Sequence, residues 1–460
     1  MSVTRLSKSD AIINVGSDAS YVIDGNDDTI LIGDDSTLVA RGSGLLIDAL
    51  KADDVITIGG SNDVVVFNAP GTLHELANSS LEVLANDARV SMAGGDTLSV
   101  FGASDIVYAV AGLGDCLSIG GNGAGATNAE LDAVIGLESG SLLEIAYSTV
   151  WASGGNFTAT VADHDRLSAL GSGIQIYATG DDDTVFLTGG DNQTPGGDDV
   201  VHMNNGSVFI TQHSSVSVFG DNLYVYAYGN DTVSLTGADD RLALGSFGNS
   251  VTIGQNGNPN AGLDVVQFSY TPLAEHVTVL SQSNVRVAGS NANVTLGSDD
   301  QLTLIGFQEQ IVDQTGNNHI TIGGNGSVFF GQTNNYVTMA AGDTVTMLAN
   351  SNLTLFSPDS ATNGEYAVHM STKDALSIDQ GMTVYVPVAV GDDLLLNFGS
   401  SDVLQLASHF SSVNDLLAHA TEDFLGRTVV QLDAGTDTLT LGMDKATFTT
   451  YAQEGLIKFR

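Results

Sequence analysis

Several features that would assign this sequence to a common class of protein are missing. Cys116 is the one cysteine among 460 residues, so no disulfide can form within the chain. Only six prolines occur, and none forms a Pro-rich hinge between domains. No apolar run reaches the roughly 18 residues that a membrane-spanning helix requires, so we predict no membrane insertion. The N-terminal segment 1–14 contains no hydrophobic stretch typical of a signal peptide; export, if it occurs, is expected to be directed from elsewhere.

Positive charge is the scarcest property of the chain. Thirteen Lys and Arg residues stand against 54 Asp and Glu residues, which gives a net charge of −41. Such a protein is repelled by nucleic acid and by anionic membranes, so neither is predicted as a partner. Two interpretations of the acidity stay open. It keeps a long β-rich surface soluble, or the carboxylates stack in ladders that bind a divalent cation.

Catalytic motifs are also missing. The sequence contains neither the HExxH pattern of zinc proteases nor the GxSxG pattern of serine hydrolases, and its nine histidines are scattered. Enzymes that act on acidic polysaccharides cluster basic side chains to hold the substrate, and this chain has few to cluster. We therefore predict that the protein is not an enzyme.

What the sequence does contain is a repeated pattern. Residues 231–237, DTVSLTG, alternate apolar and polar side chains after an Asp and end in Gly, which is typical of a short strand and a tight turn. Near copies begin at four other positions, and successive copies differ by 68, 69, 66 and 69 in residue number. The starting residues are Asp28, Asp96, Asp165, Asp231 and Asp300. The chain is therefore a repeat protein.

A second set of similar segments follows the first, in four of five cases with a shift of 18 or 19 in residue number. Its members begin at Asp54, Asp115, Asp183, Asn249 and Asn318. A weaker strand lies between the two sets, so each strand with its turn occupies about nine residues, as in Asp231, Asp240 and Asn249.

These periods predict an all-β fold, an elongated parallel β-solenoid (β-roll or β-helix) built from repeats of about 68 residues. The shift of 18 or 19 favours coils of two strands, and coils of three strands and about 22 residues fit the longer period equally well. A β-propeller is the alternative fold. We divide the chain into the opening of the solenoid (1–27), the solenoid repeats (28–397), and a small C-terminal α+β cap (398–460). In the cap, Ser412 and Asp415 predict the start of a helix, and 428–433 and 437–442 are predicted strands.

Two features together resemble the repeats-in-toxin family of type I secreted proteins. Gly229-Asn230-Asp231-Thr232-Val233 matches half of the family's nonapeptide GGxGxDxUx, in which U is apolar, as do residues 94–98 and 197–201. The stretch 398–460 resembles the uncleaved C-terminal secretion segment of the family. The resemblance implies a calcium-bound β-roll, export by the type I secretion machinery, and a secreted, extracellular or cell-surface location. The chain departs from the family in that no complete GGxGxD occurs.

Two groups of side chains are candidates for binding. Carboxylates stacked one coil apart would repel one another, and a bridging calcium ion would relieve the repulsion. The candidate calcium ligands are Asp28, Asp54, Asp96, Asp115, Asp165, Asp183, Asp231 and Asp300. Tyr224, Tyr226 and Tyr228 alternate along one strand and form a candidate contact stripe for a sugar, such as a cell-surface polysaccharide, or for a neighbouring molecule.

The repeats occupy nearly the whole chain, which favours a structural role over an attached activity. We predict a secreted protein that self-assembles into a filament or surface layer, stabilised by calcium, with residues 1–16 in the contact between molecules. The prediction rests on the ends of a solenoid: the C-terminal end has a cap, whereas strand-like sequence begins by Ala11-Ile12-Ile13 without one. The alternatives are a polysaccharide-acting β-solenoid enzyme and a monomeric calcium-dependent adhesin or ligand-binding module.

Overall fold

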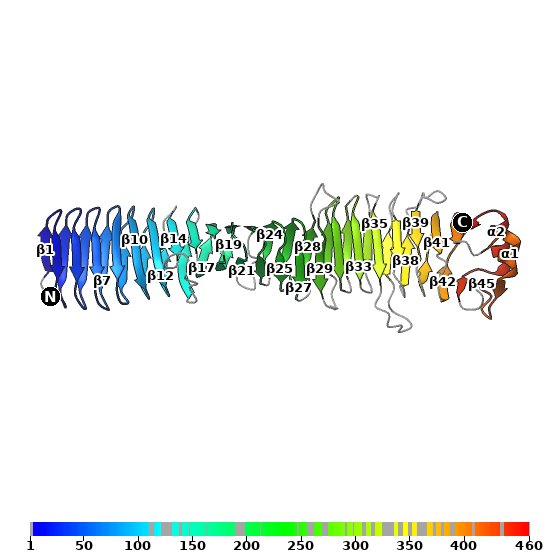
Figure 1. Cartoon of the computed structure of the whole chain (residues 1–460), viewed down its shortest axis with the longest axis horizontal. Helices are drawn as coiled ribbons and strands as arrows, with labels where there is room; N and C mark the ends of the chain where they lie inside the picture. The colour runs from blue at the N-terminus through cyan, green and yellow to red at the C-terminus, as the bar shows by residue number, and fades with distance from the viewer. Residues whose placement is uncertain are drawn as a thin grey trace. The chain divides into compact units, whose positions relative to one another are not determined.

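The chain forms coils of parallel β-structure (Figure 1). A computed structural model describes residues 3–109, 115–120, 131–137, 140–146, 148–162, 164–188, 198–211, 213–245, 248–254, 262–268, 275–289, 292–297, 299–305, 310–313, 318–323, 335–338, 344–347, 352–356, 366–370, 374–378, 381–386, 392–406, 410–432 and 437–459. Two compact units divide the chain, Met1–Tyr226 and Ala227–Arg460. In each unit the odd-numbered strands form one sheet and the even-numbered strands form the other, apart from β45 (Thr428–Gln431) in the C-terminal segment, which joins the even-numbered sheet.

In the first unit, one sheet contains β1 (Val3–Ser7), β3 (Ser20–Asp24), β5 (Thr37–Arg41), β7 (Val55–Gly59), β9 (Thr72–Glu75), β11 (Arg89–Met92), β13 (Ile106–Ala109), β15 (Leu131–Leu137), β17 (Thr149–Gly155), β19 (Arg166–Ser172), β21 (Thr184–Thr188), β23 (Ser207–Ile210) and β25 (Tyr224–Ala227). The other contains β2 (Ile12–Val15), β4 (Thr29–Ile32), β6 (Leu46–Ala49), β8 (Asp63–Phe67), β10 (Ser80–Asn86), β12 (Thr97–Ala103), β14 (Cys116–Gly120), β16 (Leu142–Ala146), β18 (Thr158–Val161), β20 (Gln175–Ala178), β22 (Asp198–His202) and β24 (Ser215–Phe219).

In the second unit, the odd-numbered strands are β27 (Arg241–Leu244), β29 (Asp264–Phe268), β31 (Asn284–Ala288), β33 (Gln301–Ile305), β35 (His319–Gly323), β37 (Thr344–Met347), β39 (Tyr366–His369), β41 (Met382–Val386), β43 (Val403–Leu406) and β47 (Ile457–Phe459). The even-numbered strands are β26 (Thr232–Thr236), β28 (Ser250–Ile253), β30 (Glu275–Val279), β32 (Ala292–Leu296), β34 (Gln310–Asp313), β36 (Asn335–Thr338), β38 (Asn352–Phe356), β40 (Ala375–Ser377), β42 (Asp392–Leu396) and β46 (Thr438–Leu441).

Each coil consists of two strands and two turns, because the coil strands before the C-terminal segment pair in parallel with the next but one along the chain. Val3 of β1 pairs with Ser20 of β3, and Ser20 pairs with Thr37 of β5, so the residue number advances by 17 with each of these coils. The parallel solenoid and its two-strand coil are confirmed. The three-strand coil and the propeller are wrong.

The core lies between the two sheets and consists of stacked rows of apolar side chains. In β4 the pattern is half-buried, buried, half-buried, buried, and this alternation recurs along the described strands. Ile13, Ile30, Ile47 and Val65 are in register on successive even-numbered strands, and each is at most 5% exposed. No strand buries enough apolar surface by itself, so the coils are stable only when stacked.

Asp and Asn dominate the turns because each coil needs a residue in the left-handed backbone region. Asp10, Asp18, Asp27 and Asp35 have φ values of 50 to 56°, a range that Asn, Asp and Gly adopt more readily than other residues. The turn backbones also stack. The N–H of Asp18 donates to the carbonyl of Asp34, 2.8 Å away, and the N–H of Asp27 donates to the carbonyl of Ser43, 3.0 Å away.

The coil, and not the longer spacing between motif copies, is the structural repeat. In the first unit, Asp28 precedes β4 and Asp96 precedes β12, both in the even-numbered sheet. Asp165 precedes β19, seven strands after β12, so it starts a strand of the odd-numbered sheet. In the second unit, Asp231 before β26 and Asp300 before β33 are separated by seven strands in the same way. Equivalent sequence motifs thus start strands in either sheet.

The C-terminal segment covers the end of the second unit with elements that differ from the coils (Figure 1). β46 pairs in parallel with β42, and β45 (Thr428–Gln431) and β44 (Ala420–Glu422) extend this sheet in antiparallel fashion. β47 pairs with β43. The predicted helix is α1 (Val413–Ala418), where Ser412 accepts the N–H of Asp415. A second helix that we did not predict, α2 (Lys445–Gln453), buries Phe448 and Ala452.

Candidate functional site

The candidate site is a set of buried acidic side chains at the starts of strands, which we call the carboxylate rows. All eight predicted calcium ligands belong to it, and each is at most 2% exposed. The rows in each unit run along both edges of the coils, since either sheet supplies members. Further buried acidic residues are Asp63, Glu75, Asp105, Asp132, Asp199, Asp240, Asp264, Glu275, Asp374, Asp393 and Asp402.

Most carboxylates in the rows accept a backbone hydrogen bond from the preceding coil. The N–H of Ala11 donates to Oδ1 of Asp28 at 2.8 Å, and that of Ser36 donates to Oδ1 of Asp54 at 2.9 Å. Seven of the eight predicted residues follow this pattern, with these donors: Ala11 to Asp28, Ser36 to Asp54, Ser79 to Asp96, Gly95 and Asp96 to Asp115, Ser148 to Asp165, Asp165 to Asp183, and Ser283 to Asp300. The carboxylates thereby satisfy buried donors that would otherwise lower stability.

Asp231 is the eighth predicted residue, and its contacts place it in the same kind of row. Its Oδ2 accepts the N–H of Gly229, 3.0 Å away in its own turn. Its N–H donates to Oδ1 of Asn249, 3.1 Å away in the next coil. Asn318 likewise accepts the N–H of Asp300 at 2.6 Å. A neutral amide oxygen therefore serves this backbone contact as well as a carboxylate does.

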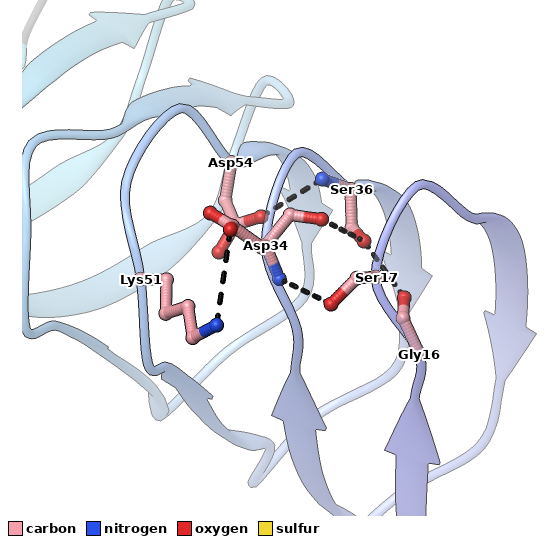
Figure 2. Close-up of polar contacts among 6 residues, drawn as sticks. All are labelled: Gly16, Ser17, Asp34, Ser36, Lys51 and Asp54. Atoms are coloured by element: carbon pink, nitrogen blue, oxygen red, sulfur yellow. Dashed lines mark hydrogen bonds and ion pairs between the residues drawn. The ribbon is translucent and has the colours of Figure 1, made fainter.

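Figure 2 shows one such corner in the first unit, around Asp54. Ser36 donates its N–H to Asp54 and its hydroxyl to the carbonyl oxygens of Gly16, at 2.8 Å, and Asp34, at 3.2 Å. On the outer side, the hydroxyl of Ser17 accepts the N–H of Asp34, and the ammonium of Lys51 lies 3.8 Å from the Asp34 carboxylate. The corner thus has an inner carboxylate fixed by the backbone and an outer one exposed to solvent.

Burial raises the pKa of several members of the rows, because a carboxylate loses favourable hydration inside the protein. The pKa of Asp63 rises to about 6, that of Asp105 to about 7, and that of Asp199 to about 6. Desolvation also raises the pKa of Asp54 and of Asp96. Some of these groups are therefore partly protonated near neutral pH.

Glu75 differs from the rest because it replaces an apolar residue in the core. It ends β9 in register with Ile58 and is 4% exposed, and neither carboxylate oxygen has a hydrogen-bond partner among the described residues. Desolvation, together with the like charges of Asp96, Asp115 and Asp63, raises its pKa to about 9. Glu75 is therefore protonated at neutral pH.

The carboxylate rows meet only part of what a calcium ion requires, since that ion prefers six to eight oxygen ligands. Buried Oδ2 atoms of Asp28, Asp54 and Asp105 have no hydrogen-bond partner among the described residues and could each supply one ligand. Within the described part of the chain, however, no three His, Cys, Asp or Glu side chains form a group that could hold a metal. The buried rows thus contain isolated oxygens, and exposed turn carboxylates, such as Asp18, lie outside them.

The predicted tyrosine stripe lies partly on an outward surface of the first unit. Tyr224 and Tyr226 are half-buried on β25, where they alternate with the buried Val225 and Ala227. Both rings contact Phe209, with centroids 6.2 and 6.4 Å apart. Tyr228, two residues further on, is 49% exposed. Tyr224 and Tyr226 are thus partly engaged with a neighbouring aromatic ring.

A row of stacked rings that we did not predict lies on the even-numbered sheet of the first unit. Tyr177, His202 and Phe219 stack in register with centroid separations of 4.9 Å. The signal that could have found it is the outward position of each ring in its strand once the coil length is known. Because the rings stack on one another, the row contributes to pairing between coils.

Cys116 begins β14 and is half-buried on the outward side of that strand. It therefore lies outside the core, because the inward position belongs to Leu117.

The comparisons with known proteins do not extend the structural result. No protein-family model, curated protein or solved structure matches the chain. Among the described residues, no helix is both long and apolar enough to cross a membrane. Fold and side-chain geometry therefore provide the basis for a functional proposal.

Proposed function

We propose that the protein is a secreted, non-enzymatic building block that self-assembles outside the cell, as a filament or surface layer, and is stabilised by calcium. The chain resembles the repeats-in-toxin family, and the proposal includes export by the type I secretion machinery through residues 398–460. The two-strand parallel coil supports this proposal, because it is the fold that the family resemblance implies.

The observation that carries the proposal is the difference between the two ends of the coil structure. Among the described residues, β1 pairs only with β3 and β2 only with β4, so one edge of each strand is free. The last coil, in contrast, is covered by β44, β45 and both helices. A free edge of parallel strands presents unpaired N–H and C=O groups that favour pairing with another chain. When two different ends of identical molecules meet, the contact repeats from copy to copy, and it builds an open filament when the rotation between copies does not close a ring.

Calcium enters the proposal through the charge of the surface. Turn carboxylates recur on successive coils. Burial is the main cause that raises the pKa of Asp54, and the negative charges of Asp34, Asp35 and Asp53 raise it further. A net charge of −41 opposes association between molecules. A divalent ion that bridges exposed carboxylates would reduce repulsion both within and between molecules, and the buried oxygens of Asp28 and Asp54 would add ligands.

Sedimentation velocity of the full chain, with and without millimolar calcium, tests the proposal directly. We expect species larger than the monomer in calcium and mainly monomer in chelator at low salt, with electron microscopy showing filaments or sheets. A chain lacking residues 1–16 should associate more weakly than the full chain in calcium, because it loses the exposed side chains of the first coil. A full-length monomer at every calcium concentration would contradict the proposal.

A second candidate is a monomeric adhesin that binds a cell-surface polysaccharide. The outward tyrosines favour it, because tyrosine rings present apolar surface together with a hydroxyl that can bond a sugar. Replacing Tyr224, Tyr226 and Tyr228 with serine should then abolish retention on immobilised polysaccharide. Under the assembly proposal, the same triple variant should sediment as the unmodified chain does.

A further inference from the structure

The most exposed apolar side chains of the described residues are concentrated in two places. Phe424 is 94% exposed and Leu425 is 61% exposed, and both lie in the turn between β44 and β45 of the cap. Ile12 is 75% exposed on the outer side of β2, and Val3 is 57% exposed on the outer side of β1, the other strand of the first coil. The next large apolar side chain, Leu50, is 51% exposed and lies in a turn away from both. Large apolar side chains so exposed are common at contact sites between proteins.

The turn that carries Phe424 and Leu425 is held by its own polar contacts. Oδ1 of Asp423 accepts the N–H groups of Leu425 and Arg427, each at 2.9 Å. Oδ2 of Asp423 accepts Nε–H of Arg427 at 2.8 Å, and a second guanidinium nitrogen lies 2.8 Å from the same oxygen. Gly426, with φ of 76°, closes the turn by donating to the carbonyl of Asp423 at 3.1 Å. The backbone that carries the two apolar side chains is therefore fixed, which lowers the entropic cost of ordering the turn on binding.

The two places also differ in charge. Residues 3–16 contain Arg5 and Lys8 against Asp10, a net charge of +1 in a chain of net charge −41. Residues 398–460 contain eight acidic residues against four basic ones, a net charge of −4. Opposite charge favours contact between the first coil and the cap, and it disfavours contact between two first coils or two caps.

We infer that the Phe424–Leu425 turn of one copy binds the first coil of a second copy, at Ile12, and forms a head-to-tail contact. The inference rests on the proposed self-assembly and names its interface. Ile12 and the Phe424–Leu425 pair supply buried area at the centre of the contact, and Arg5 and Lys8 of the first coil attract the acidic cap. The free edges of β1 and β2 lie in the same coil and are covered by the incoming cap.

Complementation between two variants tests this contact. The first variant is Phe424→Ser combined with Leu425→Ser, and the second is Ile12→Asp; Leu50→Ser is the control for loss of an exposed apolar residue. All are measured as full-length chains by sedimentation velocity in millimolar calcium. Each of the first two should weaken association by about tenfold or more, whereas the control should sediment like the unmodified chain. Mixed together, the two defective variants should form dimers and nothing larger, because one intact contact remains.

The outcomes separate the interface from the proposed function. If the Phe424/Leu425 variant assembles like the unmodified chain, the interface is wrong and self-assembly stands. If that variant instead stops at dimers, first coils pair with each other, and the inference is again wrong. A mixture that stays monomeric overturns the inference too. If the unmodified chain itself is monomeric, the proposed function fails. Circular dichroism and melting of each variant should match the unmodified chain, because all four side chains are exposed.

Discussion

Replacing Glu75 with methionine should stabilise the protein, and the gain should grow as the pH rises. In the folded chain the pKa of Glu75 is about 9, whereas its ordinary value is 4.5. Below pH 4.5 the side chain is protonated in both states and its ionisation has no effect on folding. Above pH 4.5 ionisation of Glu75 stabilises the unfolded chain. In the folded chain Glu75 stays protonated until about pH 9. Stability is therefore lost across this interval.

The size of the effect follows from the two pKa values. Each pH unit above 4.5 costs the folded state about 1.4 kcal/mol, so Glu75 destabilises the protein by about 3 kcal/mol at pH 7 and by less than about 1 kcal/mol at pH 5. Methionine removes this cost and adds an apolar side chain beside Ile58. Glu75→Gln removes the ionisation while keeping a polar group, so it should lose the same pH dependence without the apolar gain.

Urea unfolding followed by circular dichroism at pH 5, 7 and 8.5 measures the difference between each variant and the unmodified chain. Glu82→Gln provides a matched control, because it makes the same substitution at an exposed position on the neighbouring β10. The reasoning is refuted if the gain from Glu75→Met is the same at pH 5 and pH 8.5.

Three other predictions concern the rows, calcium and export. Asp54→Ala leaves the N–H of Ser36 without its acceptor and should lower the free energy of unfolding by about 1–3 kcal/mol. Asp54→Asn keeps an acceptor oxygen and should lower it much less. Equal losses for the two variants in urea titrations would show that the carboxylate itself is needed. Millimolar calcium should raise the melting temperature and a chelator should reverse it, so an unchanged melting curve counts against the calcium part of the proposal. Removing residues 398–460 should keep the chain inside a host with a type I exporter. A tag before Met1 should leave export unchanged. Export of the soluble truncated chain would contradict this prediction.

The parallel β-solenoid could be predicted because its signal is repeated many times along the chain. Each strand contributes one alternation of apolar and polar residues, and Asp or Asn occupies most of the left-handed turn positions in the described residues. The choice between two and three strands per coil could not be made, because the longer connections obscure the step from one coil to the next. The regular spacing of the motif copies suggested a larger unit that the strand pairing does not contain.

The carboxylate rows show where sequence reasoning stops. An Asp before an apolar strand has the same local pattern whether its side chain turns outward or accepts a buried N–H, and only strand register decides. Asp54 is buried while its neighbour Asp53 is exposed. Glu75 gave no signal at all, because a single acidic residue at the end of β9 does not alter the period. Helix α2 was missed because the threonines in KATFTTYAQ have low helix propensity, and burial of Phe448 outweighs them.

The seven-strand spacing between Asp96 and Asp165 has a consequence for how such a chain can change in length. Seven strands make three and a half coils, so a motif copied at this distance moves from one sheet to the other. Its inward side chains still point inward, because both sheets are built on the same alternation around one core. Gain or loss of a single strand with its turn would therefore exchange the two outer surfaces of everything that follows while leaving the interior intact. A surface can thus be moved from one side of the molecule to the other by one small insertion.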